Sequence, residues 1–179
     1  EGGDAYRPAD YTNRAEFAKF VVEAAGLMSD APSEPTFSDV PADHWAYSFV
    51  EAAASNGVVN GYENGKYGPG DRVTRSQMAK MIVLGFDLPA SDDCPFSDCD
   101  DLEDWAVPYV SAAAAAGVIT GYPDGTFGGD KNANRAETAK MVSEGMTVEV
   151  MDDDAADDDA ADDDAADDDA TDDDTADDA

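Results

Sequence analysis

Three segments of the chain carry apolar side chains at helical spacing. The apolar positions are Phe17, Phe20, Val21 and Ala24 in the first segment, Met78, Met81 and Ile82 in the second, and Met141 and Val142 in the third. In front of each segment, Asn or Thr is followed three residues later by Glu or Gln, the capping-box arrangement of a helix start. These pairs are Asn13 with Glu16, Thr74 with Gln77, and Asn134 with Glu137. The pattern predicts three short amphipathic helices ending near glycines, at Gly26, Gly85 and Gly145.

A second kind of segment occurs twice, and it begins with Phe-Ser-Asp. Its apolar positions predict a further helix in each copy: Trp45, Phe49, Val50 and Ala53, then Trp105, Tyr109, Val110 and Ala113. Gly57 and Gly117 should end these helices. The Asn-Gly and Asp-Gly pairs that follow predict tight turns in loops with very short strands, without a real sheet.

The two kinds of segment combine into a repeat that is present twice in full and once in part. Residues 37–82 align with residues 96–142 almost without gaps, whereas residues 6–21 match only the second half. We therefore divide the chain into a partial first repeat (1–36), a second repeat (37–90), a third repeat (91–150) and a tail (151–179). One such repeat cannot bury its own apolar face, so packing between repeats must build the core of a mainly α-helical fold.

The charge of the chain predicts the state of its tail and excludes one class of partner. The chain has 42 acidic and 10 basic residues and a formal net charge of -32. The tail is almost entirely Asp and Ala, so it should be disordered and extended by self-repulsion. Nucleic acid is excluded as a partner because phosphate binding requires a basic face. No apolar run approaches the roughly 20 residues of a membrane span.

The two cysteines, Cys94 and Cys99, are close neighbours in a loop. A local disulfide is favoured if the chain is extracellular, and a pair of reduced thiols is the alternative. The first residue is not methionine, as expected of a processed secreted protein or an excised fragment. A zinc site is disfavoured because no further soft ligand is near and His44, the only histidine, belongs to the other full repeat.

The most informative charges are the arginines that directly follow the three caps, Arg14, Arg75 and Arg135. A cation in the first helical turn opposes the helix dipole, so stability alone favours an acid there. Free helix amides and a guanidinium together would suit a carboxylate or phosphate. Alternatively, each arginine bridges to an acid of a neighbouring repeat, such as Asp39 or Asp98. The spacing gives these two interpretations equal weight.

Other candidate chemistry is weaker. Tyr62 and Tyr122, which follow glycines in loops, are the expected surface contacts for a sugar, while most other aromatics should be core. Asp98, Asp100 and Asp101 are weak calcium candidates, because their loop does not have EF-hand spacing. No nucleophile elbow, phosphate loop or metalloprotease motif occurs, so we expect neither an enzyme nor a cofactor.

The motifs Phe-x-Asp-Val, His-Trp-Ala, Gly-Tyr-x-x-Gly-x-Tyr/Phe and Thr-Arg-Ala-Glu resemble the S-layer homology (SLH) repeat of bacterial surface proteins. The resemblance covers residues 6–142 and implies a pseudo-threefold helical bundle at the cell surface. It also implies non-covalent binding of a cell-wall polysaccharide, often one bearing pyruvate ketals, in grooves between repeats. The groove motif corresponds to Thr74 and Arg75 and to the Arg-Ala-Glu runs that end at Glu16 and Glu137. This chain departs from the consensus with Asn-Arg-Ala-Glu twice, Thr-Arg-Ser-Gln once and Asp104 before Trp105.

Two functions follow as hypotheses. The first is a secreted, non-catalytic module that binds wall polysaccharide through these grooves. The alternative is a structural subunit that self-assembles into a surface layer or filament. In that case another copy of the chain would complete the partial first repeat. Residues 147–151 alternate like a strand and could pair with another chain.

Overall fold

The computed structural model describes residues 7–153, and in this part of the chain the regular structure is helical. The α-helices are α1 (Arg14–Ala24), α2 (Tyr47–Ser55), α3 (Arg75–Gly85), α4 (Val107–Ala115) and α5 (Arg135–Asp153). A single 3-10 turn, Cys99–Asp101, precedes α4. The short strands expected in the loops after Gly57 and Gly117 are absent, and the described residues instead form three isolated antiparallel bridges beside the caps. A mainly α fold without a sheet is therefore confirmed for the described residues. The predicted disordered tail lies outside the described residues from residue 154 onward.

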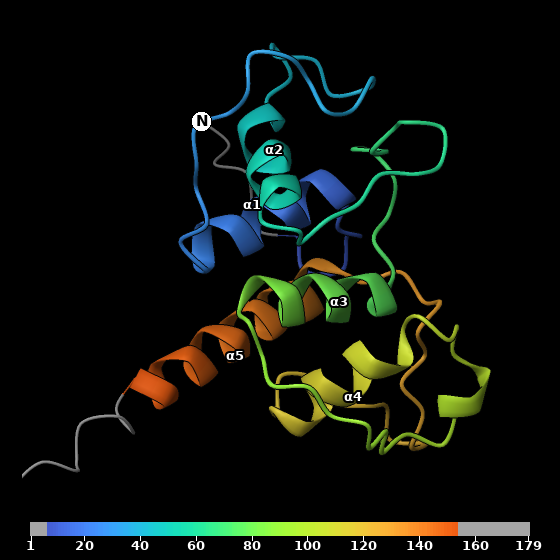
Figure 1. Ribbon diagram of the computed structural model, residues 1–179. Coiled ribbons are helices and arrows are strands. Elements are labelled where there is room, and N and C mark those ends of the chain that lie inside the picture. The colour runs from blue at the N-terminus through green and yellow to red at the C-terminus, as the bar shows by residue number, and fades with distance from the viewer. Residues whose placement is uncertain (1–6, 154–179) are drawn as a thin grey trace, which may run out of the picture.

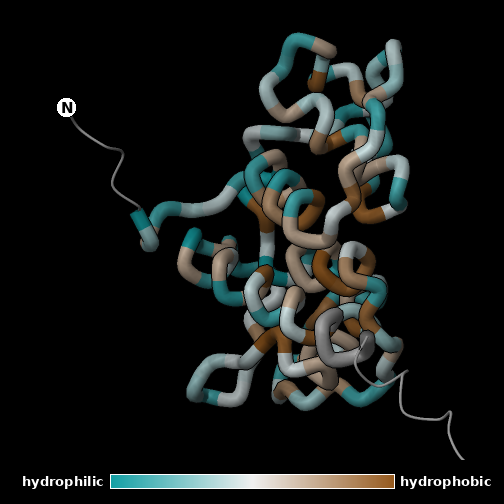
Figure 2. Tube along the Cα trace, turned by 90° about the vertical axis from the view of Figure 1, so that its left-hand side faces the viewer, coloured by the Kyte–Doolittle hydropathy of each residue, from teal (hydrophilic) through white to brown (hydrophobic). Residues whose placement is uncertain are grey.

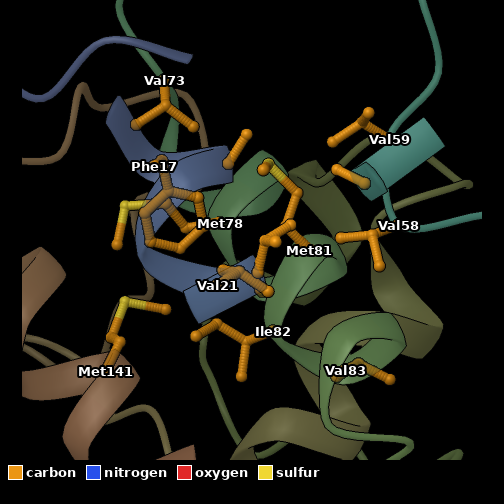
Figure 3. Close-up of a cluster of buried hydrophobic side chains, with 14 of the residues drawn as sticks. Phe17, Val21, Val58, Val59, Val73, Met78, Met81, Ile82, Val83 and Met141 are labelled. Atoms are coloured by element: carbon orange, nitrogen blue, oxygen red, sulfur yellow. The ribbon is translucent and has the colours of Figure 1, made fainter. Parts of the chain in front are cut away.

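The three capped helices form the centre of the molecule. Helices α1, α3 and α5 pack against one another, while α2 packs on α1 and α4 packs on α3 (Figure 1). Phe17 and Met78 are fully buried between these helices, together with Val21 and Ile82, and Met141 is buried beside them (Figure 3). In Figure 2 the hydrophobic segments gather inside and the hydrophilic ones on the outer loops. The core is therefore shared by all three repeats, as the pseudo-threefold arrangement requires.

A ring of backbone hydrogen bonds joins the residues that precede the three caps. The amide of Thr12 donates to the carbonyl of Ala133 at 3.0 Å, Ala133 donates to Val73 at 3.0 Å, and Val73 donates back to Thr12 at 3.1 Å. All three residues are fully buried. We call these three residues the collar. Because each one bonds to both others, the three repeats close on themselves and do not stack as an open array.

Helix starts match the sequence prediction, and the reciprocal capping bonds are present. The Asn13 side chain accepts from the Glu16 amide at 2.8 Å and the Glu16 carboxylate accepts from the Asn13 amide at 3.0 Å. The other two caps bond in the same way. At the C-terminal ends, Gly26, Gly57 and Gly117 have positive φ and follow α1, α2 and α4, as predicted.

One helix end was predicted wrongly. Helix α3 ends at Gly85, as predicted, although the positive φ falls on Asp87 and not on the glycine. Helix α5 does not stop near Gly145 but continues to Asp153. The expected strand at residues 147–151 is therefore wrong, because these residues belong to α5. The C-terminal part of α5 projects beyond the other helices (Figure 1).

One face of α5 is exposed, although the corresponding face of α1 is buried. Ala139 and Ser143 are exposed, although the equivalent residues of α1, Ala18 and Val22, are fully buried. The reason is topological, since α2 and α4 each cover one central helix and no corresponding helix covers α5 among the described residues. Met146 on the same helix is 47% exposed.

Candidate functional site

Two grooves lie at corresponding positions between repeats, and each contains an arginine, a glycine-tyrosine loop and a lysine. The Arg14 groove has a volume of about 530 Å³ and the Arg75 groove about 180 Å³. The Arg14 groove is lined by Arg14, residues 58–63, Gln77, Lys80, Met81 and Trp105. The Arg75 groove is lined by Arg75, residues 118–122, Glu137, Lys140 and Met141.

The loop wall of each groove is a tight turn held by backbone bonds. In the Arg14 groove the Tyr62 amide donates to the Lys66 carbonyl at 2.7 Å, and the Gly65 amide donates to the Tyr62 carbonyl at 3.0 Å. Gly65 adopts a positive φ of 75°, which favours glycine. At Gly61 a β-carbon would collide with the ring of Phe37, so only glycine permits this close approach. The turn therefore holds this wall of the groove in a fixed conformation.

The aspartate of each Phe-Ser-Asp motif anchors this loop, a role that the sequence alone did not reveal. Asp39 accepts from the amides of Tyr67 and Gly68 at 2.8 and 2.9 Å, and Asp98 accepts from Phe127 and Gly128 at 2.7 and 2.8 Å. Partial burial alone would raise the pKa of Asp39, but the two amides together outweigh it and hold the pKa below its usual value. The same causes lower the pKa of Asp98. The recurrence of Phe-Ser-Asp in both full repeats was the available signal.

Arg14 is buried, with 6% of its surface exposed, and it binds the loop of the next repeat. Its Nε donates to the Tyr67 carbonyl at 2.9 Å and its Nη2 donates to the Asn60 carbonyl at 3.2 Å. The guanidinium carbon lies 5.0 Å from the ring centre of Tyr62 and 4.6 Å from that of Tyr67. In return, the Tyr67 hydroxyl donates to the Arg14 carbonyl at 2.9 Å. Arg14 thus locks two repeats together.

Arg75 repeats this arrangement one repeat later, with one addition. Its Nε and Nη2 donate to the carbonyls of Phe127 and Thr120 at 2.9 and 3.1 Å, and it lies 4.9 Å from the ring centre of Tyr122. In addition, its Nη1 forms an ion pair with Glu137 at 3.0 Å. The Arg75 groove therefore contains a carboxylate of its own against the guanidinium.

The interpretation of the arginines as inter-repeat ion pairs is confirmed for two of the three, but with different acids from those expected. Arg75 pairs with Glu137 and Arg135 pairs with Glu16 at 3.5 Å. Asp39 and Asp98 are not their partners, because both are occupied by loop amides. For Arg14 no carboxylate lies within ion-pair distance in the described part of the chain.

The predicted contribution of free helix amides is wrong. The amides of Arg14 and Ala15 donate to the carbonyls of Asp71 and Pro69 at 2.8 and 3.2 Å, and the other two central helices are satisfied in the same way. Thr74 serves as the N-cap of α3 and lines neither groove. Any anion site must therefore be built from side chains rather than from a helix terminus.

Aromatic side chains divide between core and groove. Tyr67 and Phe127 are fully buried, as expected, and Tyr62 and Tyr122 line the grooves. The expectation that Trp45 and Trp105 belong to the core is wrong. They are 56% and 41% exposed, and Trp105 forms one wall of the Arg14 groove beside Lys80, whose Nζ lies 5.7 Å from its ring centre.

Comparison with known families agrees with this repeat geometry. The model of the S-layer homology domain matches residues 36–79 and 95–139, the two full repeats. The chain belongs to the S-layer homology family.

Relatives of this S-layer homology chain are much longer proteins. It is 34% identical over 121 residues to the S-layer protein sap of Bacillus anthracis, which is 67% of this chain and 15% of that protein. It is 35% identical over 123 residues to the surface-layer 125 kDa protein of Lysinibacillus sphaericus, covering 66% of this chain and 10% of that protein. It is also 25% identical over 151 residues to a cellulosome-anchoring protein of Acetivibrio thermocellus, covering 80% of this chain and 34% of that protein. The chain therefore spans about a third or less of each.

Membership of the S-layer homology family places the chain outside the cell, at the cell surface. The cysteines agree with an oxidising compartment, because Cys94 and Cys99 form the expected disulfide with their Cα atoms 6.2 Å apart. Within residues 7–153 no helix is both long and apolar enough to cross a bilayer.

The remaining candidate residues are the possible calcium ligands and His44. Asp98 gives both carboxylate oxygens to loop amides, and Asp100 and Asp101 lie in the 3-10 turn. No group of three or more His, Cys, Asp or Glu in the described region converges on a possible metal position. A calcium requirement stays a prediction. The Nδ1 atom of His44 accepts from the Ala46 amide at 3.1 Å, just before α2.

Proposed function

We propose that this chain is a non-catalytic module that attaches to the cell wall by binding a wall polysaccharide in the inter-repeat grooves. The observation that supports the proposal most directly is the composition of the grooves. Each combines a tyrosine ring, a buried arginine and a lysine, in a protein that has only 10 basic residues. Rings that stack on sugars and cations that attract acidic substituents suit an acidic polysaccharide. A pyruvate ketal, which carries a carboxylate, is the substituent that we propose.

Wall binding is tested by co-sedimentation of the full chain with isolated cell-wall fragments. The arginines are poor targets because they support the loops, so the groove variant replaces the two groove lysines, Lys80→Gln with Lys140→Gln. The matched control, Lys66→Gln with Arg72→Gln, removes the same charge from positions outside both grooves. We expect the groove variant to lose about tenfold or more in wall affinity, since a bond to a charged group contributes 1.5–3 kcal/mol. Equal retention of the groove variant and the control would contradict the proposal.

A second candidate function, self-association, is favoured by the uncovered face of α5. A hollow of about 480 Å³ lies between α1 and α5, and its apolar lining includes Phe20, Val142 and Met146. Exposed apolar surface of this kind marks interaction sites, and a second copy offers the same face for a symmetric contact.

Sedimentation velocity over a range of concentrations tests self-association. We expect the wild-type chain to form dimers or larger species as its concentration rises, and Ala139→Glu to remain monomeric because a charge would be buried in the contact. Ala42→Glu adds the same charge at an exposed position away from this face and should behave as wild type. A wild-type chain that stays monomeric throughout would rule the candidate out.

A further inference from the structure

The two Phe-Ser-Asp turns, residues 37–39 and 96–98, have matching local hydrogen bonds. The amide of the turn serine donates to the Gly65 carbonyl at 3.1 Å in the second repeat and to the Gly125 carbonyl at 3.0 Å in the third. In both turns the aspartate anchors the loop of a groove. The two turns therefore hold corresponding loops in the same way, and any difference between them must lie in how the turns themselves are attached.

The turn of the second repeat is attached through a buried carboxylate. Thr36, directly before this turn, donates from its amide to the Oε1 atom of Glu51 at 2.8 Å and from its hydroxyl to the Oε2 atom at 2.6 Å. Glu51 belongs to α2 and is 3% exposed. Hydrogen bonds to a carboxylate are strong, more so where water is excluded. We call these two bonds the Glu51 clamp, and it ties the start of the turn to α2.

This clamp cannot form in the third repeat. The residue aligned with Thr36 is Pro95, which has neither an amide hydrogen nor a hydroxyl group. The residue aligned with Glu51 is Ser111, whose Oγ atom is buried without a hydrogen-bond partner in the described part of the chain. Both sides of the clamp are thus replaced, and the turn of the third repeat needs another attachment.

The disulfide between Cys94 and Cys99 supplies that attachment. It joins the residue directly before Pro95 to the residue directly after Asp98, so a covalent ring closes around the turn. The aligned positions of the second repeat hold proline and valine, which cannot form such a bond. A cross-link of this kind limits the conformations open to the segment that it encloses.

The ring contains the residue that anchors the loop of the Arg75 groove. Asp98 accepts from the amides of Phe127 and Gly128 at 2.7 and 2.8 Å. The Phe127 carbonyl accepts in turn from the Nε atom of Arg75 at 2.9 Å. A series of bonds therefore connects the disulfide, through the turn and the loop, to the guanidinium in the groove.

We infer that the Cys94–Cys99 disulfide is a redox-sensitive clamp on the Arg75 groove, whereas the Glu51 clamp holds the Arg14 groove in any redox state. Both cysteines are half-buried, so a small dithiol can reach the bond. One thiolate of the dithiol attacks a cysteine sulfur and forms a mixed disulfide, which its second thiolate then resolves. Two electrons and two protons pass to the cysteine sulfurs, which become thiols, and the dithiol becomes a cyclic disulfide.

Amide exchange measures this clamp in the full chain without any ligand. The amides of Phe127 and Gly128 report on the Asp98 anchor. Those of Tyr67 and Gly68 are the matched internal control, because an aspartate holds them in the same way. Hydrogen exchange of the isotope-labelled chain is followed by NMR with and without dithiothreitol, and a count of free thiols verifies reduction. We expect reduction to accelerate exchange of the third-repeat pair about tenfold or more and to change the second-repeat pair less than about twofold.

Two variants exchange the attachments. Cys94→Ser with Cys99→Ser removes the bond, so the third-repeat amides should exchange rapidly without dithiothreitol and no faster with it. Thr36→Pro with Glu51→Ser gives the second repeat the residues found in the third, without a disulfide. We expect its second-repeat amides to exchange about tenfold faster in both redox states. Circular dichroism verifies that both variants remain helical.

The inference is overturned by unchanged exchange at Phe127 and Gly128 after complete reduction. Equal acceleration of all four amides would also overturn it, because the disulfide would then stabilise the whole fold and not one groove. A response of the double-serine variant to dithiothreitol would place the redox effect elsewhere. The inference goes beyond the proposed function, since the exchange experiment contains no polysaccharide. Failure of wall binding leaves the clamp intact, and failure of the clamp leaves wall binding intact.

Discussion

Arginine at the same position of each repeat has a different electrostatic environment in each case. Arg75 is paired with a glutamate at 3.0 Å, Arg135 with one at 3.5 Å, and Arg14 with none in the described chain. The arginines themselves are identical, so the difference arises from the residue that faces each one. Repetition of a motif therefore does not imply repetition of its chemistry.

The aspartates that anchor the groove loops should make stability depend on pH. The pKa of Asp39 is lowered in the folded protein, so its contribution is present above the unfolded-state pKa of about 3.9 and is lost as pH falls through the folded-state pKa. We expect Asp39→Asn to lower the free energy of unfolding by about 1–2 kcal/mol at neutral pH, because one loop amide loses its acceptor. The difference from wild type should shrink in strong acid.

Urea unfolding at several pH values measures this effect, and Asp98→Asn should behave in the same way. Asp30→Asn serves as the control because Asp30 is exposed. A loss of stability in Asp39→Asn that is equally large at all pH values would show that the carboxylate charge is not responsible.

At the scale of the helix, local signals were sufficient for the starts of the central helices and for most helix ends, but not for the end of α5. Capping boxes involve residues three apart, so the sequence alone located the first residues of α1, α3 and α5 correctly. Two of the glycines expected at helix ends have another role. A β-carbon at Gly145 would lie 3.0 Å from the ring of Phe86, and one at Gly85 would collide with Val21. These glycines permit close packing between helices, which depends on contacts that are distant in sequence.

Prediction of the candidate site from the sequence was limited in the same way, because part of the site depends on contacts that are distant in sequence. The sequence identified the arginines and tyrosines of the grooves, because they repeat beside caps and turns. It misplaced Trp105, since an aromatic at an equivalent position in each repeat resembles a core residue, whereas this one is 41% exposed. It also could not show that Gln77 and Arg14 line the same groove, because this depends on how the repeats pack.

For the whole molecule, the collar and the shared core predict cooperative unfolding. Thr12, Val73 and Ala133 belong to different repeats, and the loss of one repeat would break two of the three collar bonds. We therefore expect all described repeats to unfold in one transition.

Single-tryptophan variants provide the measurement, because Trp45 belongs to the second repeat and Trp105 to the third. Trp105→Phe and Trp45→Phe should give coincident midpoints in urea when each is followed by fluorescence and by circular dichroism. Separate midpoints for fluorescence and circular dichroism within one variant would show that repeats unfold independently.

The collar also fixes how such a chain could grow. Each of its three members donates one bond and accepts one, so no edge is left for a fourth. A duplication of one more repeat would have to start a new ring instead of lengthening the existing one. Additional repeats would therefore strengthen attachment only as complete rings of three. The gain would be avidity between separate modules on one chain.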